Sequence, residues 1–373
     1  MPLNEKRTRT VTGVINDEEK GVMRQEAASN VHVAVVIPVR NRSDLLERCL
    51  ASLADQVFSM AECEVLVCDD CSQENLRPIL NRFREKLPRI RLLRQDSWKG
   101  PAAARNFGIR AVGAPIVLFL DSDTLSDHAL VRHLLAALDR NPEWVGAEAK
   151  IESVGRKENP LWDGPVCPNG GRYHTAAIAY RRDALIRAGG LDETFKMPAC
   201  EDVDLAMRLL KEGSIGFVPE AIVYHPTRRV TLKTFWNWRR YWKYVMILAK
   251  RYGVLAFPGK SAGSFPRLRV ALAAVLTLPG GRLLTACGHL KHQPWEGLLA
   301  CFYAFFEAIC GVCALPDILF ESVPPYKDYL SSETKDSGGN LTSVPHSIPD
   351  SQWPGGAGTG NISSTGDKHG EIS

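Results

Sequence analysis

The sequence lacks several features that would place it at once in a simple class of protein. Its formal net charge is only +4 over 373 residues, which is too small to indicate a nucleic-acid partner. It has no internal repeat, and residues 1–30 are polar and charged, so we expect no signal peptide. The ten cysteines follow no regular spacing, which favours a reducing compartment. The Cys68-x-x-Cys71 pair lacks the second pair that a zinc site would need.

What the sequence contains instead is a series of short apolar segments that end in polar turns. Segments with apolar residues at helical spacing alternate with them. This alternation predicts an α/β fold with a doubly wound, mostly parallel sheet whose loops meet at the carboxyl edge. With 45% hydrophobic residues, the chain can bury a large core. The predicted strands are Val33–Pro38, Glu64–Cys68, Ile90–Leu93 and Ile116–Leu120.

The last of these strands leads directly into two acids, Asp121 and Asp123. A run that is apolar throughout is typical of a strand buried on both faces. Two carboxylates at its end repel one another unless a cation or hydrogen-bond donors compensate them. They therefore predict a metal site at the edge where open α/β sheets bind ligands. From this segment alone, a solvated turn before a helix near Asp127 remains open.

Six sequence blocks follow one another in a fixed order. They are Ile37–Asn41, Asp69–Ser72, Gly100–Asn106, the Asp-x-Asp motif Asp121–Asp123, Gly189–Glu193 and Glu201–Leu205. Together they resemble glycosyltransferase family 2, whose members have the nucleotide-diphosphosugar-binding GT-A fold, over residues 31–252. Two departures from the family pattern remove no charged ligand: Cys71 stands where glycine is usual, and Cys200 precedes the Glu-Asp pair.

The resemblance implies a binding site for a nucleotide-diphosphate sugar. In the family, the acidic turn that corresponds to Asp69 and Asp70 contacts the nucleobase. The alternative for this pair is a plain Asx turn, and the alternative for Arg40 and Arg105 is a solvated loop arginine. The residues expected to contact the donor are Pro38, Arg40, Asn41, Asp69, Asp70, Arg105, Asp121 and Ser122.

A departing diphosphate needs positive charge, which a divalent cation supplies. Asp123 and Asp121 are the predicted ligands, and oxygen ligation favours Mg²⁺ or Mn²⁺ over zinc. His225, at the end of a late strand, resembles a further metal ligand found in part of this fold, and an imidazole would favour Mn²⁺. A purely structural histidine is the open alternative.

Catalysis also needs a base, because an acceptor hydroxyl must lose its proton as it attacks the anomeric carbon. The resemblance assigns this role to Asp202, with Glu201 as the second candidate. It also implies direct displacement with inversion at the anomeric carbon. The alternative is that both acids only favour the dipole of the helix that begins beside them.

Beyond this block the composition changes, and we expect contact with a membrane. Residues 226–251 are basic and aromatic and contain no acid, which is typical of a helix on an anionic membrane surface. Packing of the aromatic side chains onto the catalytic domain is the alternative. Gly297–Leu315 approaches spanning length but carries Glu307, so we expect monotopic or hairpin attachment at the cytoplasmic face.

The expected organisation is a polar extension (1–30), a catalytic domain (31–252), a hydrophobic helical region (253–330) and a disordered tail (331–373). The expected function is an inverting, metal-dependent transfer of a sugar to the hydroxyl of a glycan or lipid-linked acceptor. A nucleotidyltransferase of related fold would carry a glycine-rich loop after the first strand, where this chain has no glycine. A catalytically silent nucleotide-sugar-binding or scaffolding protein is the second alternative.

Overall fold

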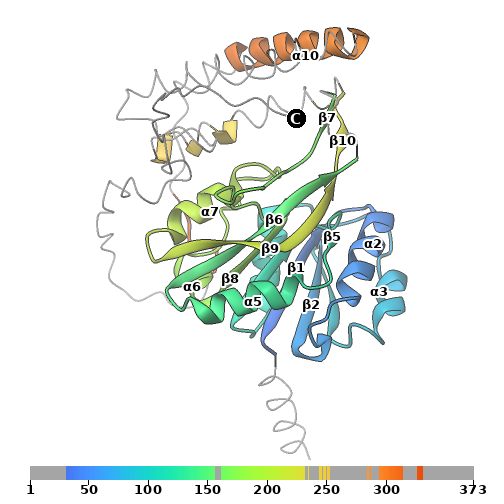
Figure 1. The fold of residues 1–373 in the computed structure, drawn as a ribbon, viewed down its shortest axis with the longest axis vertical. Helices are drawn as coiled ribbons and strands as arrows, with labels where there is room; N and C mark the ends of the chain where they lie inside the picture. Colours follow the sequence, from blue (N-terminus) through green and yellow to red (C-terminus); the bar gives the residue numbers. More distant parts are fainter. Residues whose placement is uncertain are drawn as a thin grey trace, which may run out of the picture.

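The computed structural model describes residues 31–155, 161–231, 294–313 and 326–330. It also describes Thr234, residues 243–245, 247–248 and 250–252, Leu284 and Cys287. Within these residues, an eight-stranded mixed sheet forms the centre of the molecule and helices cover both of its faces (Figure 1). The strand order in this sheet is β3-β2-β1-β4-β8-β6-β9-β5.

The first half of the sheet is parallel, as the sequence predicts. β1 (Val33–Val39) pairs in parallel with both β2 (Cys63–Asp69) and β4 (Ile116–Leu120), and β2 pairs in parallel with β3 (Ile90–Arg94). All residues of β4 are buried, so this strand needs no polar face. Because these strands run in one direction, the turns that follow them meet at the same edge of the sheet.

The second half of the sheet is mixed. β8 (Ala177–Arg181) runs antiparallel to both β4 and β6 (Trp144–Val154). β6 pairs in parallel with the long strand β9 (Ser214–Pro226), and β5 (Leu125–Ser126) pairs antiparallel with the end of β9. The prediction of a mostly parallel sheet is confirmed, and β5 and β8 are the strands that run against the others.

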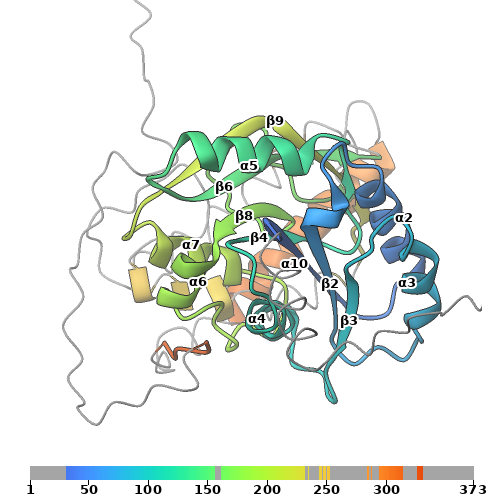
Figure 2. The same cartoon turned by 90° about the horizontal axis from the view of Figure 1, so that it is seen from below.

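Two buried cores lie on opposite faces of the sheet. The helices that cover them are α2 (Ser43–Ala54), α3 (Arg77–Phe83), α4 (Pro101–Ala111), α5 (Leu130–Arg140), α6 (Arg182–Arg187) and α7 (Glu201–Leu209), with a 3-10 turn, η1, at Met60–Glu62. Successive residues of a strand point to opposite faces. Val35 and Ile37 therefore join the core under α2, α3 and α5, whereas Ala34 and Val36 join the core under α4, α6 and α7. Figure 2 shows α2 and α3 side by side, away from α6 and α7.

A small second sheet and a long helix lie beyond the end of β9. β7 (Trp162–Asp163) pairs antiparallel with β10 (Arg228–Arg229), and α10 (Pro294–Cys313) lies above this ribbon in Figure 1. Ala300 and Tyr303 of α10 are buried in a small cluster beside the ribbon. None of the helices in the described ranges is both long enough and apolar enough to cross a bilayer.

Part of the basic and aromatic segment 226–251 packs onto the sheet domain. Tyr244, Ile247 and Leu248 are buried against Phe195, next to the start of α7. For these residues the structure favours the alternative of packing onto the catalytic domain. The tryptophans and the phenylalanine at 235–242, together with the extension 1–30 and the tail 331–373, lie outside the described residues.

Residues 326–330 also return to the sheet domain. The Tyr326 hydroxyl donates a hydrogen bond of 2.7 Å to the carbonyl of Ala188. The backbone N–H of Tyr329 donates to the carbonyl of Gly189 at 3.0 Å. This short segment therefore covers the turn that begins the block Gly189–Glu193, although about 140 residues separate the two in sequence.

Candidate active site

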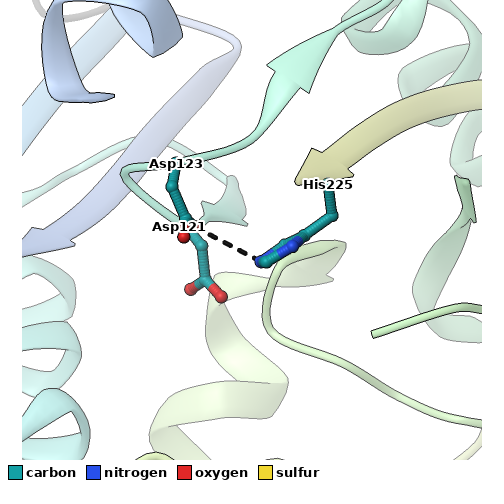
Figure 3. A group of neighbouring side chains, drawn as sticks. All are labelled: Asp121, Asp123 and His225. Carbon is teal, nitrogen blue, oxygen red and sulfur yellow. Dashed lines mark ion pairs between the residues drawn. The ribbon is translucent and has the colours of Figure 1, made fainter. Parts of the chain in front are cut away.

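Three side chains with metal-binding atoms gather at the carboxyl edge of the sheet (Figure 3). Asp121 and Asp123 lie in the turn after β4, and His225 lies near the end of β9. One ligand atom from each residue lies within 4.8 Å of the other two. His225 is brought here by the pairing of β9 with β5, the strand that directly follows the two acids. The predicted metal ligands therefore form one cluster.

The His225 ring is oriented as a metal ligand requires. Its Nδ1 lies 3.0 Å from the carbonyl oxygen of Pro226. Since a carbonyl can only accept, Nδ1 carries the proton and Nε2 carries the lone pair. This Nε2 faces Asp123 Oδ1 at 3.3 Å. Burial lowers the pKa of His225, which favours the neutral imidazole that binds metals. Two facing acceptor atoms fit a cation between them.

Two arginines balance the charge of Asp123. Arg228, in β10, forms an ion pair with Asp123 Oδ2, and Arg42, in the turn after β1, lies 3.5 Å from the same oxygen. Their side chains are 52% and 45% exposed, so both can reorient towards a ligand in solvent. Neither arginine was predicted from the sequence to belong to the site. The only signal was the position of Arg228 three residues after His225.

Arg105 connects the metal cluster with the helix that carries the candidate base. Its guanidinium is 3% exposed and lies 2.7 Å from Asp121 Oδ1 and 3.3 Å from Glu201 Oε1. Arg105 was predicted to contact the nucleotide, and the structure shows its guanidinium held by these two acids. Small residues precede it on α4, and they let this helix pack closely against the sheet.

Glu201 is buried in the centre of this arrangement, and its Oε2 has no hydrogen-bond partner among the described residues. Burial and the neighbouring Asp202 carboxylate raise the pKa of Glu201 to about 8, although Arg105 acts in the opposite direction. Near neutral pH, Glu201 therefore keeps its proton.

Asp202 is the more accessible of the two acids. Its side chain is 15% exposed, its Oδ1 accepts a 2.8 Å hydrogen bond from the N–H of Val203, and its Oδ2 lies 3.2 Å from His174 Nδ1. Cys200 precedes α7 with a left-handed φ of 71°, so the chain turns sharply and the helix begins at Glu201. Acids in this first turn also interact favourably with the helix dipole, which is the alternative role considered for Glu201 and Asp202.

The acidic turn after β2 has partners of its own. Asp69 accepts a 2.5 Å contact from Arg94 and a 2.8 Å hydrogen bond from the N–H of Ser72, which is an Asx-type contact. Asp70 accepts hydrogen bonds of 2.8 Å and 2.9 Å from the N–H groups of Lys99 and Gly100. Both carboxylates are buried. Asp69 ties this turn to the end of β3, and Asp70 ties it to the start of α4. Their contact with a nucleobase remains a prediction.

The turn after β1 is tied to the same region. The N–H of Asn41 donates to Ser72 Oγ at 2.7 Å. Arg40 is exposed, and its guanidinium lies 5.3 Å from the centre of the Trp98 ring. This surface offers a cation and an aromatic face beside the predicted nucleotide position. The remaining predicted donor contacts, both partly buried at this edge, are Pro38 and Ser122.

Asn106 is a buried polar residue whose function the sequence analysis missed. Its Nδ2 donates to the carbonyl of Leu191 at 2.8 Å and to Glu193 Oε1 at 3.0 Å, and its Oδ1 accepts the N–H of Leu191 at 2.9 Å. Asn106 thus fixes the block Gly189–Glu193 against α4. Its position next to Arg105 was the available signal.

Comparison with known families agrees with this geometry. The family described as Glycosyl transferase family 2 matches residues 34–185. This range holds both acidic turns, Arg105 and the Asp-x-Asp motif. Residues 34–185 are therefore similar to a family 2 glycosyltransferase domain. The resemblance inferred from the ordered blocks is confirmed.

The chain is also similar to two bacterial proteins. Pre-mycofactocin glycosyltransferase of Mycobacterium tuberculosis is 33% identical over 220 residues, which cover 54% of this chain and 44% of that protein. O-antigen biosynthesis protein RfbC of Myxococcus xanthus is 34% identical over 203 residues, which cover 52% of this chain and 16% of that protein. The chain therefore spans less than half the length of either relative.

The fold of the chain is similar to that of a solved mannosyltransferase. A mannosyltransferase from Pyrobaculum calidifontis, in complex with GDP-Man and Mn²⁺, aligns with 78% of this chain and 87% of its own length. The TM-score is 0.51 and the identity is 19%. At this identity the similarity concerns the fold, a largely parallel sheet with helices on both faces.

Proposed function

We propose that this protein is an inverting, metal-dependent glycosyltransferase that moves a sugar from a nucleotide diphosphate to a hydroxyl of a glycan or lipid-linked acceptor. The observation that carries the proposal is the cluster of Asp121, Asp123 and His225 in a chain that matches the family 2 model. Arg105 joins Asp121 of this cluster to Glu201, the neighbour of Asp202 in sequence. The relative named for O-antigen biosynthesis supports a glycan acceptor.

The metal cluster is proposed to hold Mn²⁺ or Mg²⁺. Two carboxylates and a neutral imidazole suit these ions, and the related fold named with GDP-Man and Mn²⁺ supports manganese. A bound cation would neutralise the charge that develops on the diphosphate leaving group. Arg42 and Arg228 add positive charge at the same place, because both already contact Asp123 and both have exposed side chains.

The nucleoside is proposed to lie over the turns that follow β1 and β2. Asp70 and Asp69 are held rigidly by backbone N–H groups and by Arg94, so the shape of this turn is set before a ligand arrives. Arg40 and Asn41 border the same position, and the exposed face of Trp98 lies beside Arg40.

Asp202 is proposed to be the base. Glu201 retains its proton near neutrality because burial raises its pKa to about 8, which leaves Asp202 as the member of the pair that accepts a proton. The acceptor oxygen forms a bond to the anomeric carbon while the bond to the diphosphate oxygen breaks. The hydroxyl proton passes to Asp202. A single displacement of this kind inverts the configuration of the anomeric carbon.

We also propose that α10 attaches the enzyme to the cytoplasmic face of a membrane without crossing it. Every third or fourth residue of α10 is apolar and exposed, and these residues form one stripe because they recur with the helical period. The opposite side of the helix, with Ala300 and Tyr303, packs on the protein. Side chains of this kind insert into the boundary between headgroups and acyl chains. The stripe consists of Trp295 (82% exposed), Leu298 (56%), Phe302 (53%), Phe305 (65%) and Ile309 (44%).

A thermal-shift panel followed by a transfer assay tests the catalytic proposal. The full chain is mixed with UDP-, GDP- and dTDP-sugars in the presence of Mn²⁺ or of EDTA. We expect sugars of one base to raise the melting temperature with Mn²⁺ but not with EDTA. The same donor should then be hydrolysed slowly and transferred to an added acceptor. Stabilisation without hydrolysis or transfer would identify a silent nucleotide-sugar-binding protein, and no stabilisation by any sugar nucleotide would contradict the proposal.

A further inference from the structure

His174 lies against the proposed base. Its Nδ1 is 3.2 Å from Asp202 Oδ2, and the other carboxylate oxygen, Oδ1, accepts the N–H of Val203 at 2.8 Å. One oxygen is therefore fixed by the helix backbone and the other by an imidazole. The orientation of the Asp202 carboxylate depends on both contacts.

The loop that carries His174 is held by a buried acid that the transfer reaction does not use. Glu148, in the middle of β6, is 1% exposed. It accepts hydrogen bonds from the backbone N–H groups of Gly171 at 2.6 Å and Arg172 at 3.0 Å, and also from the N–H of Tyr173. A buried carboxylate is stable only when such donors surround it. These bonds fix the loop backbone directly before His174.

The backbone on either side of His174 is also constrained. Gly170, Gly171 and Tyr173 have positive φ angles, and the ring of Tyr173 is buried with 8% exposure. A left-handed conformation at tyrosine costs free energy and persists only where the surroundings enforce it. The carbonyl of His174 accepts the N–H of Ala177 at 3.2 Å, which joins the loop to the start of β8. The backbone on both sides therefore fixes the position of His174.

We propose that His174 is a positioning residue for sugar transfer, an inference that rests on the proposed function and on Asp202 as the base. The imidazole donates its Nδ1–H to Oδ2 and keeps the carboxylate in the orientation that presents its remaining lone pair to the acceptor hydroxyl. Without this hydrogen bond, the Asp202 carboxylate can rotate out of its present orientation. A small misplacement of a catalytic group costs about 10²-fold in rate. His174 belongs to none of the six blocks in which the family resemblance lies.

Kinetics of two substitutions test this role. His174→Ala should lower kcat by roughly 10- to 10²-fold and leave the donor KM and the donor-induced thermal shift unchanged, because the residue acts through Asp202. His174→Asn should recover most of the rate, since its side-chain amide can donate to the same oxygen. The control is His128→Ala, which changes a histidine with a 64% exposed side chain and should leave kcat unchanged. A loss that asparagine does not restore would overturn the inference.

A double-mutant cycle separates positioning from a general structural effect. In an Asp202→Asn background, with residual transfer measured at high enzyme concentration, His174→Ala should cost little further rate, because its partner is already disabled. An equal loss in both backgrounds would overturn the inference, as would a His174→Ala protein as fast as the native one. Those outcomes leave the proposed function intact. If the native protein transfers no sugar to any acceptor, both the proposed function and this inference are contradicted.

Discussion

The guanidinium of Arg105 lies 3.3 Å from the carboxylate of Glu201, and both side chains are buried. The same guanidinium lies 2.7 Å from Asp121. One cation thus links the turn that carries the predicted metal ligands to the helix that carries Asp202. Removing the guanidinium would leave Asp121 Oδ1 and the buried Glu201 Oε1 without their shared donor, so the two halves of the site depend on each other.

The metal cluster leads to a binding prediction. Asp123→Asn removes the carboxylate that His225, Arg42 and Arg228 all contact. UDP or GDP at about 100 times its dissociation constant should stabilise the native protein by about 2.7 kcal/mol in Mn²⁺. We expect the variant to lose nearly all of this stabilisation, as measured by thermal unfolding with Mn²⁺ and with EDTA. Asp139→Asn, an exposed acid on α5, is the control. A metal-dependent shift that survives in Asp123→Asn would remove this residue from the metal site.

If Asp202 is the base, one substitution should separate binding of the sugar nucleotide from transfer of the sugar. Asp202→Asn keeps the shape of the side chain, so the thermal shift with the preferred sugar nucleotide should be retained. Transfer should fall by about 10²- to 10⁴-fold, because general-base catalysis contributes this much. Asp183→Asn, an exposed acid in the first turn of α6, serves as the matched control. Transfer at the native rate by Asp202→Asn would mean that another group accepts the proton.

The buried Glu201 leads to a prediction about stability and pH. Its pKa is raised from the ordinary value of 4.5 to about 8 in the folded protein. Between these values the folded state keeps a proton that the unfolded state has lost, so the free energy of unfolding falls as pH rises. The stabilisation from this group is complete below pH 4.5 and is lost by about pH 8. Each pKa unit corresponds to about 1.4 kcal/mol.

Urea unfolding at several pH values between 4.5 and 8 measures this effect. Glu201→Gln cannot titrate, so its free energy of unfolding should fall less with pH than that of the native protein. Relative to the native protein, the variant should gain stability as pH rises. Glu220→Gln, an exposed acid, should follow the native curve. Parallel curves for the native protein and Glu201→Gln would show that Glu201 does not titrate in this window.

The exposed stripe of α10 leads to a prediction about membranes. The full chain should float with anionic liposomes, and a part of this binding should persist at high salt because apolar insertion is not screened. Phe302→Gln combined with Phe305→Gln removes two side chains whose burial contributes about 1.5–3 kcal/mol each, so binding should fall by about 10²-fold or more. Val57→Gln with Val166→Gln changes exposed valines elsewhere and is the control. Equal flotation of all three proteins would separate α10 from any membrane contact.

The sequence predicted those parts of the fold and site that local patterns encode. Ile116–Leu120 was predicted with the same bounds as β4. A short run that is apolar throughout is typical of a buried strand in a chain where predicted strands and helices alternate. Asp121 and Asp123 were found from the same run. His225 was assigned only through the family resemblance, since nothing local distinguishes a ligand from a structural histidine at a strand end.

The contacts between distant segments could not be predicted in this way. Arg105 lies 96 residues before Glu201, and only the folded structure shows that its guanidinium lies between Glu201 and Asp121. His174 lies in a loop without a periodic pattern. Its position depends on hydrogen bonds from the loop backbone to Glu148, which precedes Tyr173 of this loop by 25 residues. In the sequence, Arg228 is one of several basic residues in the segment 226–251, and nothing local distinguishes it from the others. Burial and charge pairing decide these roles, and both are properties of the folded chain.

The return of residues 326–330 to the turn at Ala188 and Gly189 changes how the intervening chain acts. The chain contacts the sheet domain before α10, where Leu248 is buried against Phe195, and again after α10, where Tyr326 bonds to Ala188. A membrane bound by α10 is then kept at a limited distance from the active site. This raises the effective concentration of membrane-linked acceptors at the active site. Acceptors would be selected by their height above the bilayer as well as by their chemistry.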